Sequence, residues 1–306
     1  MNLETVPCGL CGGTNAEPLF EAENSRLRVT GQKFWLQRCR SCGLVYTSPR
    51  PSLEEMGPFY CGEYYTPESS ALVKWLGDYF DRERVCYARQ SKSGGKVLDV
   101  GCGGGVFLDL MASAGFDVHG LEPSESARDH LPPAIRDRVQ FGPFENAKFQ
   151  ENSFDLVTLW HVLEHVPAPL DTLIKARELL GPGGELVVEV PNYGSIEARW
   201  LGPFWFALDV PRHFWHFTPA TLRSMAEKAG FRQISIEASS WKHPLYVGSY
   251  LLSLRPGIEC WEKVHLSAFA RWKPARLVLN VLGLLACLLG RLGPGSLPII
   301  RLRAGK

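Results

Sequence analysis

The sequence predicts an α/β protein with a parallel central sheet, preceded by a small cysteine-rich module. Two patterns lead to this prediction. Residues 96–115 consist of a short apolar strand, a glycine-rich turn and an amphipathic helix, the order found in nucleotide-binding βαβ units. Two Cys-x-x-Cys pairs lie within the first 50 residues. The chain has 306 residues, 45% hydrophobic and 21% charged, which is enough for one large domain with small attachments.

The distribution of charge indicates which partners to expect. The formal net charge is +1, so no overall positive field attracts nucleic acid, and we expect no nucleic-acid partner. Residues 255–306 differ from the rest, with nine Lys or Arg and only two Glu. The N-terminus has neither the basic start nor the apolar run of a secretory signal, so we expect a cytoplasmic protein with reduced thiols.

These features divide the chain into four predicted regions. They are a zinc-binding module (1–50), a linker (51–70), the main α/β domain (71–255) and a basic, apolar helical tail (256–306). Within the tail, residues 277–290 are almost wholly apolar, but a helix of that length rises only about 21 Å, less than the ~30 Å of a bilayer core. We therefore expect either an in-plane anchor on anionic lipid at the inner face of a membrane or a helix buried against protein.

Four cysteines in the first region form two matching pairs, Cys8 with Cys11 and Cys39 with Cys42. A glycine follows each pair, where a tight turn lets backbone amides approach the sulfurs. Zinc binds four thiolates tetrahedrally, and one Cys-x-x-Cys turn supplies two of them. A redox-active pair would instead need a thioredoxin-like βαβ unit around it. We therefore predict a structural Zn²⁺ site in a zinc-ribbon-like module.

The glycine-rich turn contains Gly101, Gly103 and Gly105, and the following helix is expected to open near Val106. Glycine lets the backbone turn sharply and pass close to a ligand. The pattern predicts a Rossmann-like domain whose ligand lies against this turn.

Two acidic residues indicate which ligand that turn accepts. Asp99 lies two residues before Gly101, where a carboxylate would repel a pyrophosphate but attract an ammonium group. Glu122 ends the next predicted strand, about 20 residues beyond the glycines, where an acid accepts hydrogen bonds from ribose hydroxyls. Together they favour S-adenosylmethionine (SAM) over a nicotinamide dinucleotide.

Several segments together resemble the ordered motifs of class I SAM-dependent methyltransferases. They are VLDVGCGGGVF, LEPS, SFDLVTLWHVLEHVPAP and LLGPGGELVVEVPN. The later PRHFWHFTPATLRSMAEKAGF resembles a segment of bacterial members, some of which also carry an N-terminal four-cysteine zinc module. The resemblance implies a seven-stranded sheet with the last strand antiparallel, and SAM across the carboxyl ends of the first strands.

The resemblance also implies a set of cofactor-binding residues. Asp99 and the glycines would line the methionine side, Glu122 would hold the ribose, and Phe144 and Glu145 would flank the adenine. The full set is Asp99, Gly101, Cys102, Gly103, Gly105, Glu122, Pro123, Phe144, Glu145 and Trp160. Many relatives have Asp at the position of Pro143, so the contact to the adenine amino group would pass to Glu145 or to the backbone.

The segment HVLEHVP offers one candidate catalytic cluster. His161, Glu164 and His165 would project from one face if the segment is a helical turn. A histidine could remove the proton of an acceptor hydroxyl. Similar ExxEH clusters hold a divalent ion in some O-methyltransferases, although His161 stands in place of their first Glu. In the alternative interpretation the three side chains only pack and hydrogen-bond.

A second cluster lies in DVPRHFWHFTP, just before a helix expected to begin at Thr218 and Pro219. His213 is the candidate we favour as catalytic base, with His161 and His165 as the others. Arg212 could pair with a charged acceptor group or only with Asp209.

These patterns predict an enzyme that methylates a hydroxyl of a small-molecule, sugar or lipid-linked acceptor. One alternative is a protein or RNA methyltransferase that uses the zinc module to hold its substrate. Another is a SAM-binding partner protein without catalytic activity.

Overall fold

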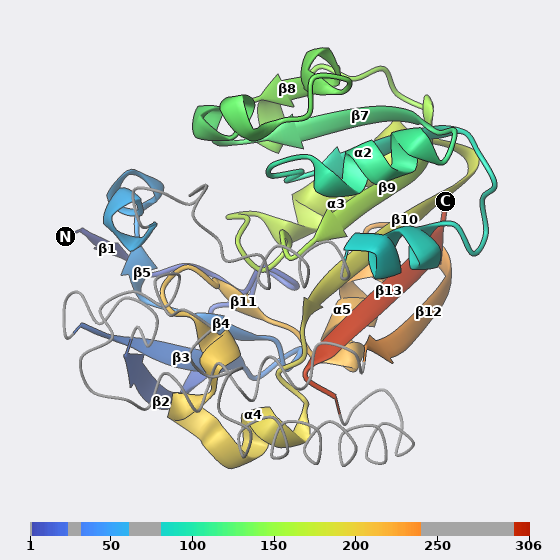
Figure 1. Ribbon diagram of the computed structural model, residues 1–306. Helices are drawn as coiled ribbons and strands as arrows, with labels where there is room; N and C mark the ends of the chain where they lie inside the picture. The colour runs from blue at the N-terminus through green and yellow to red at the C-terminus, as the bar shows by residue number, and fades with distance from the viewer. Residues whose placement is uncertain (1, 24–31, 61–80, 240–296) are drawn as a thin grey trace, which may run out of the picture.

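The computed structural model describes residues 2–23, 32–60, 81–239 and 297–306, and its largest element is a seven-stranded sheet (Figure 1). The strand order is β12-β13-β10-β9-β6-β7-β8. Their bounds are Lys96–Val100 (β6), Asp117–Glu122 (β7), Val139–Phe141 (β8), Phe154–Trp160 (β9), Leu180–Pro191 (β10), Arg232–Ser239 (β12) and Ile299–Gly305 (β13). Strands β6 to β10 pair in parallel, which confirms the predicted α/β class.

The C-terminal strand β13 completes this sheet. It lies between β10 and β12 and is antiparallel to both, as the resemblance implied. Ile300, Leu302 and Ala304 are fully buried in the core of the sheet. The sequence placed these last residues in a separate tail over 256–306, but Ile299–Gly305 belongs to the sheet of the main domain. The predicted apolar helix over 277–290 lies outside the described residues.

Helices cover both faces of the sheet and bury its apolar side chains. Helices α3 (Pro169–Leu179) and α5 (Pro219–Lys228) pack in one core cluster with β9 and β10. Helix α2 (Val106–Ser113) and the helical residues 81–88 pack in a second cluster on the other face. Helix α2 begins where the sequence predicted.

A smaller sheet forms the N-terminal module, and it includes a strand from the main domain. Its order is β11-β4-β3-β2, with bounds Ala16–Glu23 (β2), Lys33–Cys39 (β3), Val45–Thr47 (β4) and Trp215–His216 (β11). Strands β1 (Leu3–Glu4) and β5 (Arg50–Pro51) pair beside it. Between the two cysteine pairs, β2 and β3 form an antiparallel hairpin.

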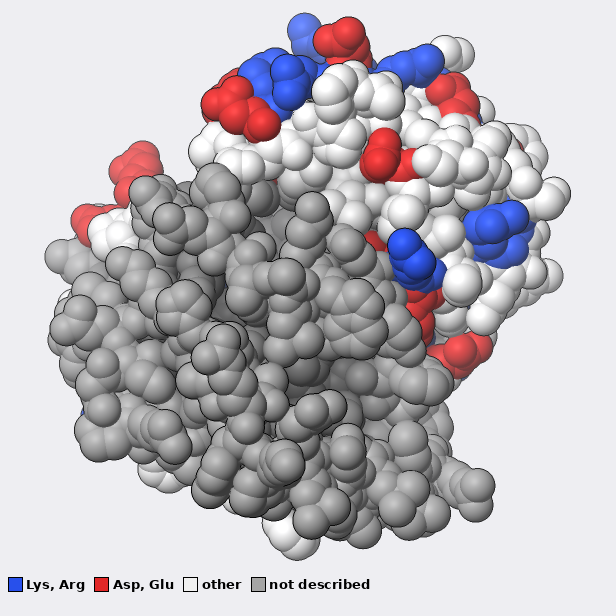
Figure 2. Space-filling model, viewed as in Figure 1, with Lys and Arg blue, Asp and Glu red and all other residues white. Residues whose placement is uncertain are grey.

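Short helices fill the connections. They are α4 (Ile196–Leu201) and the 3-10 helices Leu53–Glu55, Gly57–Phe59, Glu125–His130, Arg136–Arg138, Phe144–Asn146, Gly202–Phe204 and Phe206–Leu208. None of the helices in the described residues is long and apolar enough to cross a membrane. In the part of the surface coloured in Figure 2, basic side chains lie among acidic ones, in keeping with the small net charge.

Candidate active site

The glycine-rich turn joins β6 to α2, and two of its positions accept only glycine. Gly101 and Gly105 have positive φ angles of 74° and 76°. A Cβ atom at Gly101 would lie 2.5 Å from Cγ2 of Val162, and one at Gly105 would lie 2.6 Å from Cδ1 of Ile135. The amide of Gly101 donates to the carbonyl oxygen of Leu121 (2.7 Å), which ties the end of β6 to β7. The turn is therefore closely packed at the carboxyl edge of the sheet.

The carboxylate of Glu122 is fixed beside this turn. Its Oε2 accepts a hydrogen bond from the amide of Gly103 (2.9 Å), and its Oε1 accepts one from the amide of Ser124 (3.0 Å). The side chain is buried, whereas the next residue, Pro123, is exposed. Two backbone donors therefore hold the acid in one orientation, next to the glycines that the sequence assigned to the cofactor.

Asp99 is buried under the same edge of the sheet. Its Oδ1 accepts a hydrogen bond from the hydroxyl of Thr158 on β9 (2.6 Å). Burial raises the pKa of this carboxyl to about 7, although the Thr158 hydrogen bond opposes the rise. A cation placed against Asp99 would favour the ionised form of its carboxyl.

Two other predicted cofactor residues pack around the turn. Trp160, at the end of β9, is 7% exposed and meets the ring of Phe107 edge-on. Its Nε1 is buried and has no hydrogen-bond partner in the described part of the chain. The thiol of Cys102 is buried against Gly120, and burial raises its pKa above the usual range. Cys102 can therefore contact a ligand only through its backbone. The indole N–H of Trp160 is available to donate a hydrogen bond to a ligand.

The predicted adenine side lies in the 3-10 helix before β9. Phe144 is buried there, and Glu145 is exposed. The ammonium group of Lys175 lies 5.3 Å from the centroid of the Phe144 ring and donates a hydrogen bond to the backbone oxygen of Glu145 (2.8 Å). Only the side chain of Glu145 therefore remains exposed for a polar contact.

Residues 161–166 form a turn that is not helical, so the predicted common face is wrong. His161 has a left-handed φ of 57°, which an α-helix excludes. Its Nδ1 lies 3.0 Å from Oε1 of Glu164. Burial alone would raise the pKa of Glu164, but this contact with His161 holds it below its ordinary value. The ring of His165 instead contacts the second predicted cluster.

His161 also joins a buried network of charges that reaches the C-terminal strand. Its Nε2 lies 3.2 Å from Oε1 of Glu189, a fully buried residue of β10. Glu189 pairs with Arg84 (3.2 Å) and with Arg301 of β13 (2.5 Å), and Arg301 also pairs with Glu83. The basic side chain of Arg301, which the sequence assigned to a lipid-attracted tail, is thus neutralised inside the domain.

The two predicted histidine clusters meet at Glu164, His165 and His213. One ligand atom from each of the three lies within 4.8 Å of the others. The Nδ1 atoms of His165 and His213 donate to the carbonyl oxygens of Arg212 (3.1 Å) and Ala207 (2.9 Å), which leaves Nε2 of each ring as an acceptor. Burial lowers the pKa of His165 to about 3 and also lowers that of His213. Both rings are therefore neutral near pH 7.

This cluster has the chemistry of a proton acceptor or a divalent metal site. Oε2 of Glu164 is buried and has no hydrogen-bond partner in the described residues. Neutral imidazole nitrogens and a carboxylate are ligands for several divalent metals, and backbone carbonyls on the opposite ring nitrogens fix such ligands. The residue types, the tautomers and the spacing of Glu164, His165 and His213 thus fit a divalent ion, and His161 lies outside this set.

The remaining polar residues of the second cluster hold the loop in place. Arg212 donates two hydrogen bonds to Oδ1 of Asp209 (3.1 and 2.8 Å), and both side chains are buried. The pairing of Arg212 with Asp209, one of the two interpretations that the sequence offered, is present. Helix α5 begins as predicted, with Thr218 as its N-cap.

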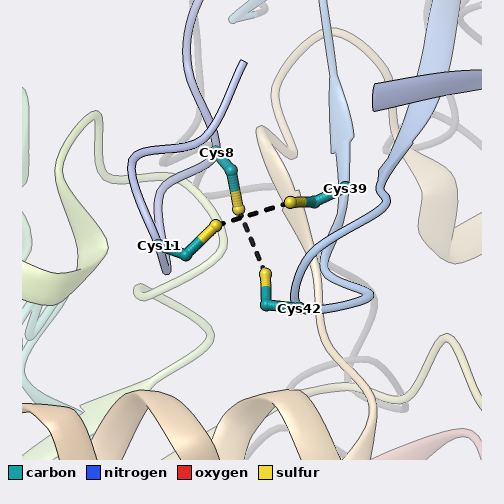
Figure 3. A group of neighbouring side chains, drawn as sticks. All are labelled: Cys8, Cys11, Cys39 and Cys42. Carbon is teal, nitrogen blue, oxygen red and sulfur yellow. Dashed lines mark hydrogen bonds between the residues drawn. The ribbon is translucent and has the colours of Figure 1, made fainter. Parts of the chain in front are cut away.

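The four cysteines converge in the N-terminal module (Figure 3). The Sγ atoms of Cys8 and Cys42 lie 3.4 Å apart, as do those of Cys11 and Cys39. Tetrahedral zinc with bonds of about 2.3 Å places its sulfurs roughly 3.8 Å apart. Burial opposes ionisation of Cys39, but hydrogen bonds from the backbone of Cys42 and Ser41 lower its pKa to about 7. The donor set fits a closed four-thiolate Zn²⁺ site.

Sequence reasoning missed several residues that shape this site. Glu189 is an acid inside the apolar strand ELVVEVPN, and a charged residue in a buried strand is a usable signal of a functional or paired position. Thr158 gives no such signal, because threonine is common in strands.

The comparison with known families gives the class of this protein. A family model described as "Methyltransferase domain" matches residues 76–236. The chain is 35% identical over 175 residues to the ubiquinone biosynthesis O-methyltransferase of Psychrobacter arcticus. The aligned region covers 52% of this chain and 67% of that protein. The chain belongs to the class I SAM-dependent methyltransferases.

Other similarities are shorter or structural. The mitochondrial ubiquinone biosynthesis O-methyltransferase of Schizosaccharomyces pombe is 38% identical over 128 residues, 39% of this chain and 44% of that protein. The chain thus spans less than half the length of that relative. A solved structure titled "[4+2]-Cyclase SpnF" matches with a TM-score of 0.51 at 19% identity, over 76% of this chain and 81% of that one. This likeness supports the fold alone.

Proposed function

We propose that this protein transfers the methyl group of SAM to a hydroxyl group of a small-molecule acceptor. The observation that carries the proposal is the cluster of Glu164, His165 and His213. The turn that holds Glu164 and His165 packs directly on the glycine-rich turn. Val162 lies in that turn, and its Cγ2 fills the space where a Cβ of Gly101 would be. The acceptor-side cluster and the predicted cofactor site are therefore neighbours.

On the cofactor side, Asp99 would receive the ammonium group of SAM and Glu122 would receive its ribose hydroxyls. Gly101, Gly103 and Gly105 would let the methionine part lie against the backbone. Phe144 and Glu145 would flank the adenine. These assignments rest on the fixed Glu122 carboxylate and on the buried Asp99 carboxyl, whose ionised form a cationic partner would stabilise.

On the acceptor side, the three-residue cluster would prepare the hydroxyl group. The methyl group of a sulfonium is already activated, so the protein must position the acceptor and remove its proton. His213 would accept the proton at Nε2, because its Nδ1 is committed to Ala207. The same three ligand atoms could instead hold a divalent ion that acidifies the hydroxyl. The metal dependence of turnover separates these two ways of working.

Aromatic side chains near the cluster support a particular class of acceptor. The ring of Tyr193 meets that of Trp205 edge-on and that of His216 at a tilt, with ring centroids 6.2 and 5.9 Å away. Nearby in the sequence, Trp200 and Phe204 are 87% and 68% exposed. Aromatic faces suit the apolar face of a sugar, a quinone precursor or a lipid-linked intermediate. The names of the relatives, which methylate oxygen in ubiquinone biosynthesis, support O-methylation of a small molecule.

The test is incubation with methyl-labelled SAM and cell extract separated into lipid, sugar-nucleotide and macromolecular pools. We expect label in a small-molecule pool, in a form that resists the conditions that cleave methyl esters. Label only in protein or RNA would replace the proposal with the macromolecular alternative. Tight SAM binding without any transfer would indicate a non-catalytic SAM-binding protein. Repeating the assay with a chelator and then added Mg²⁺, Mn²⁺ or Zn²⁺ decides between the base and the metal.

A further inference from the structure

The N-terminal module and the candidate active site share a strand. Strand β11 belongs to the loop that carries His213 and His216, yet it is the edge strand of the cysteine module's sheet. Its residues Trp215 and His216 pair antiparallel with Tyr46 and Val45 of β4. The same loop is also bound to the turn at residues 161–166, because the amide of Phe214 donates a hydrogen bond to the carbonyl oxygen of Glu164 (2.8 Å).

Thr47, the last residue of β4, makes three contacts with this loop. Its amide donates to the carbonyl oxygen of Phe214 (2.9 Å), and its hydroxyl donates to that of His213 (3.0 Å). The hydroxyl has only one hydrogen, so its 3.3 Å contact with Nε2 of His216 is a hydrogen bond donated by the ring. Thr47 therefore fixes both the backbone of His213 and the tautomer of His216.

The first cysteine turn also packs against β11. A Cβ atom at Gly9, between the first two cysteines, would lie 2.8 Å from the ring of Trp215. The guanidinium carbon of Arg50 lies 4.1 Å from the ring centroid of Phe214 and 5.3 Å from that of Trp215. The module thus packs against β11 through its cysteine turn and through β5, besides the β4 ladder.

We propose that the four-cysteine module is a positioning element of the acceptor site, acting through Thr47 on His213 and His216. The expected effect on turnover rests on the proposed function. A bound zinc ion would hold the two cysteine turns together. Strand β3 ends at the second turn and β4 follows it, so the ion would stabilise the β3–β4 pairing on which β11 adds. The effect on the acceptor site is separate from SAM, because the residues assigned to SAM make none of these contacts.

The first experiment compares Thr47→Val with Thr47→Ser in the full chain. Valine keeps the shape but removes the hydroxyl, whereas serine restores it. We expect Thr47→Val to lower kcat about tenfold with the Kd of SAM within twofold, since small misplacement of a catalytic group is costly. Thr47→Ser should stay within threefold of the wild type. A wild-type kcat for Thr47→Val, or a loss of SAM affinity equal to the loss of kcat, would overturn the proposal.

Two measurements test the inference without turnover. The ¹⁵N spectrum of the histidine rings should show His216 protonated at Nε2 in the wild type and a changed tautomer population in Thr47→Val. Amide hydrogen exchange should show faster exchange in a peptide spanning residues 212–217 after zinc is removed, with residues 97–100 unchanged. Equal protection of 212–217 with and without zinc would contradict the inference. Glu17→Gln, which changes a distant edge strand of the same sheet, is the matched control.

These readouts also separate the two proposals from each other. A wild-type protein that transfers no methyl group to any acceptor would defeat the proposed function. The ring spectra and the hydrogen exchange would still decide whether the module positions the histidine loop.

Discussion

The two sides of the candidate active site are built in different ways. The cofactor side comes from one nearly continuous segment, in which β6, the glycine turn, α2 and β7 follow one another over residues 96–122. The acceptor side joins residues 161–166, the loop 209–216 and β4 of the N-terminal module. A site made from neighbouring residues can be recognised by spacing, whereas a site made from distant segments depends on how the whole chain packs.

The largest effect should come from His213→Ala, which breaks only the acceptor side. Removing a general base or a metal ligand should lower kcat by about 10³-fold. The Kd of SAM measured by calorimetry should stay within twofold, because His213 does not contact the glycine turn. His119→Ala, a histidine of β7 outside the cluster, should keep full turnover. A large loss of SAM affinity in His213→Ala would mean that the two sides are not separable.

The second prediction concerns the charge network that joins the acceptor side to β13. Arg301→Met removes one of the two arginines that pair with the buried Glu189. Loss of a partner from a buried pair is costly, but Arg84 remains, so we expect the free energy of unfolding to fall by about 2 kcal/mol in a denaturant titration. Arg303→Met, which breaks the more exposed pair with Glu185, should cost less than ~1 kcal/mol. Equal costs would show that the network adds nothing to stability.

The third prediction breaks the cofactor side. Glu122→Ala removes the acceptor of two backbone amides and the proposed ribose contact, so SAM affinity should fall at least ~10-fold. Isothermal calorimetry measures the change, with Glu125→Ala, an exposed acid of the following 3-10 helix, as the control. Unchanged affinity in Glu122→Ala would remove Glu122 from the SAM site.

The smallest expected effect is a pH dependence of SAM binding. Burial raises the pKa of Asp99 to about 7, and the ionised form attracts the cationic ligand. SAM affinity should therefore increase as the pH rises from 6 to 7.5, by about eightfold for a single group of this pKa. Asp99→Asn should bind more weakly and lose this dependence. A wild-type affinity that falls over this range would contradict the assignment.

Some parts of this molecule could be predicted from the sequence because they depend on local geometry. The strand–turn–helix unit needs glycine at Gly101 and Gly105, and two Cys-x-x-Cys turns bring four thiols together once β2 and β3 pair. The turn at 161–166 was predicted wrongly. An i, i+3, i+4 spacing fits a helix, but the contacts of His161 with Glu164 and Glu189 accompany a left-handed backbone that the spacing does not reveal.

The sequence by itself therefore determined the α/β class, the glycine turn, the position of Glu122 and the grouping of the four cysteines. Only the tertiary structure decided that β13 lies inside the sheet, that β11 joins the N-terminal module, and that Glu164 and His165 meet His213. The physical reason is the range of the interactions involved. Turn and spacing preferences act over a few residues, whereas strand pairing and buried ion pairs join residues that are far apart in the chain and depend on the packed core.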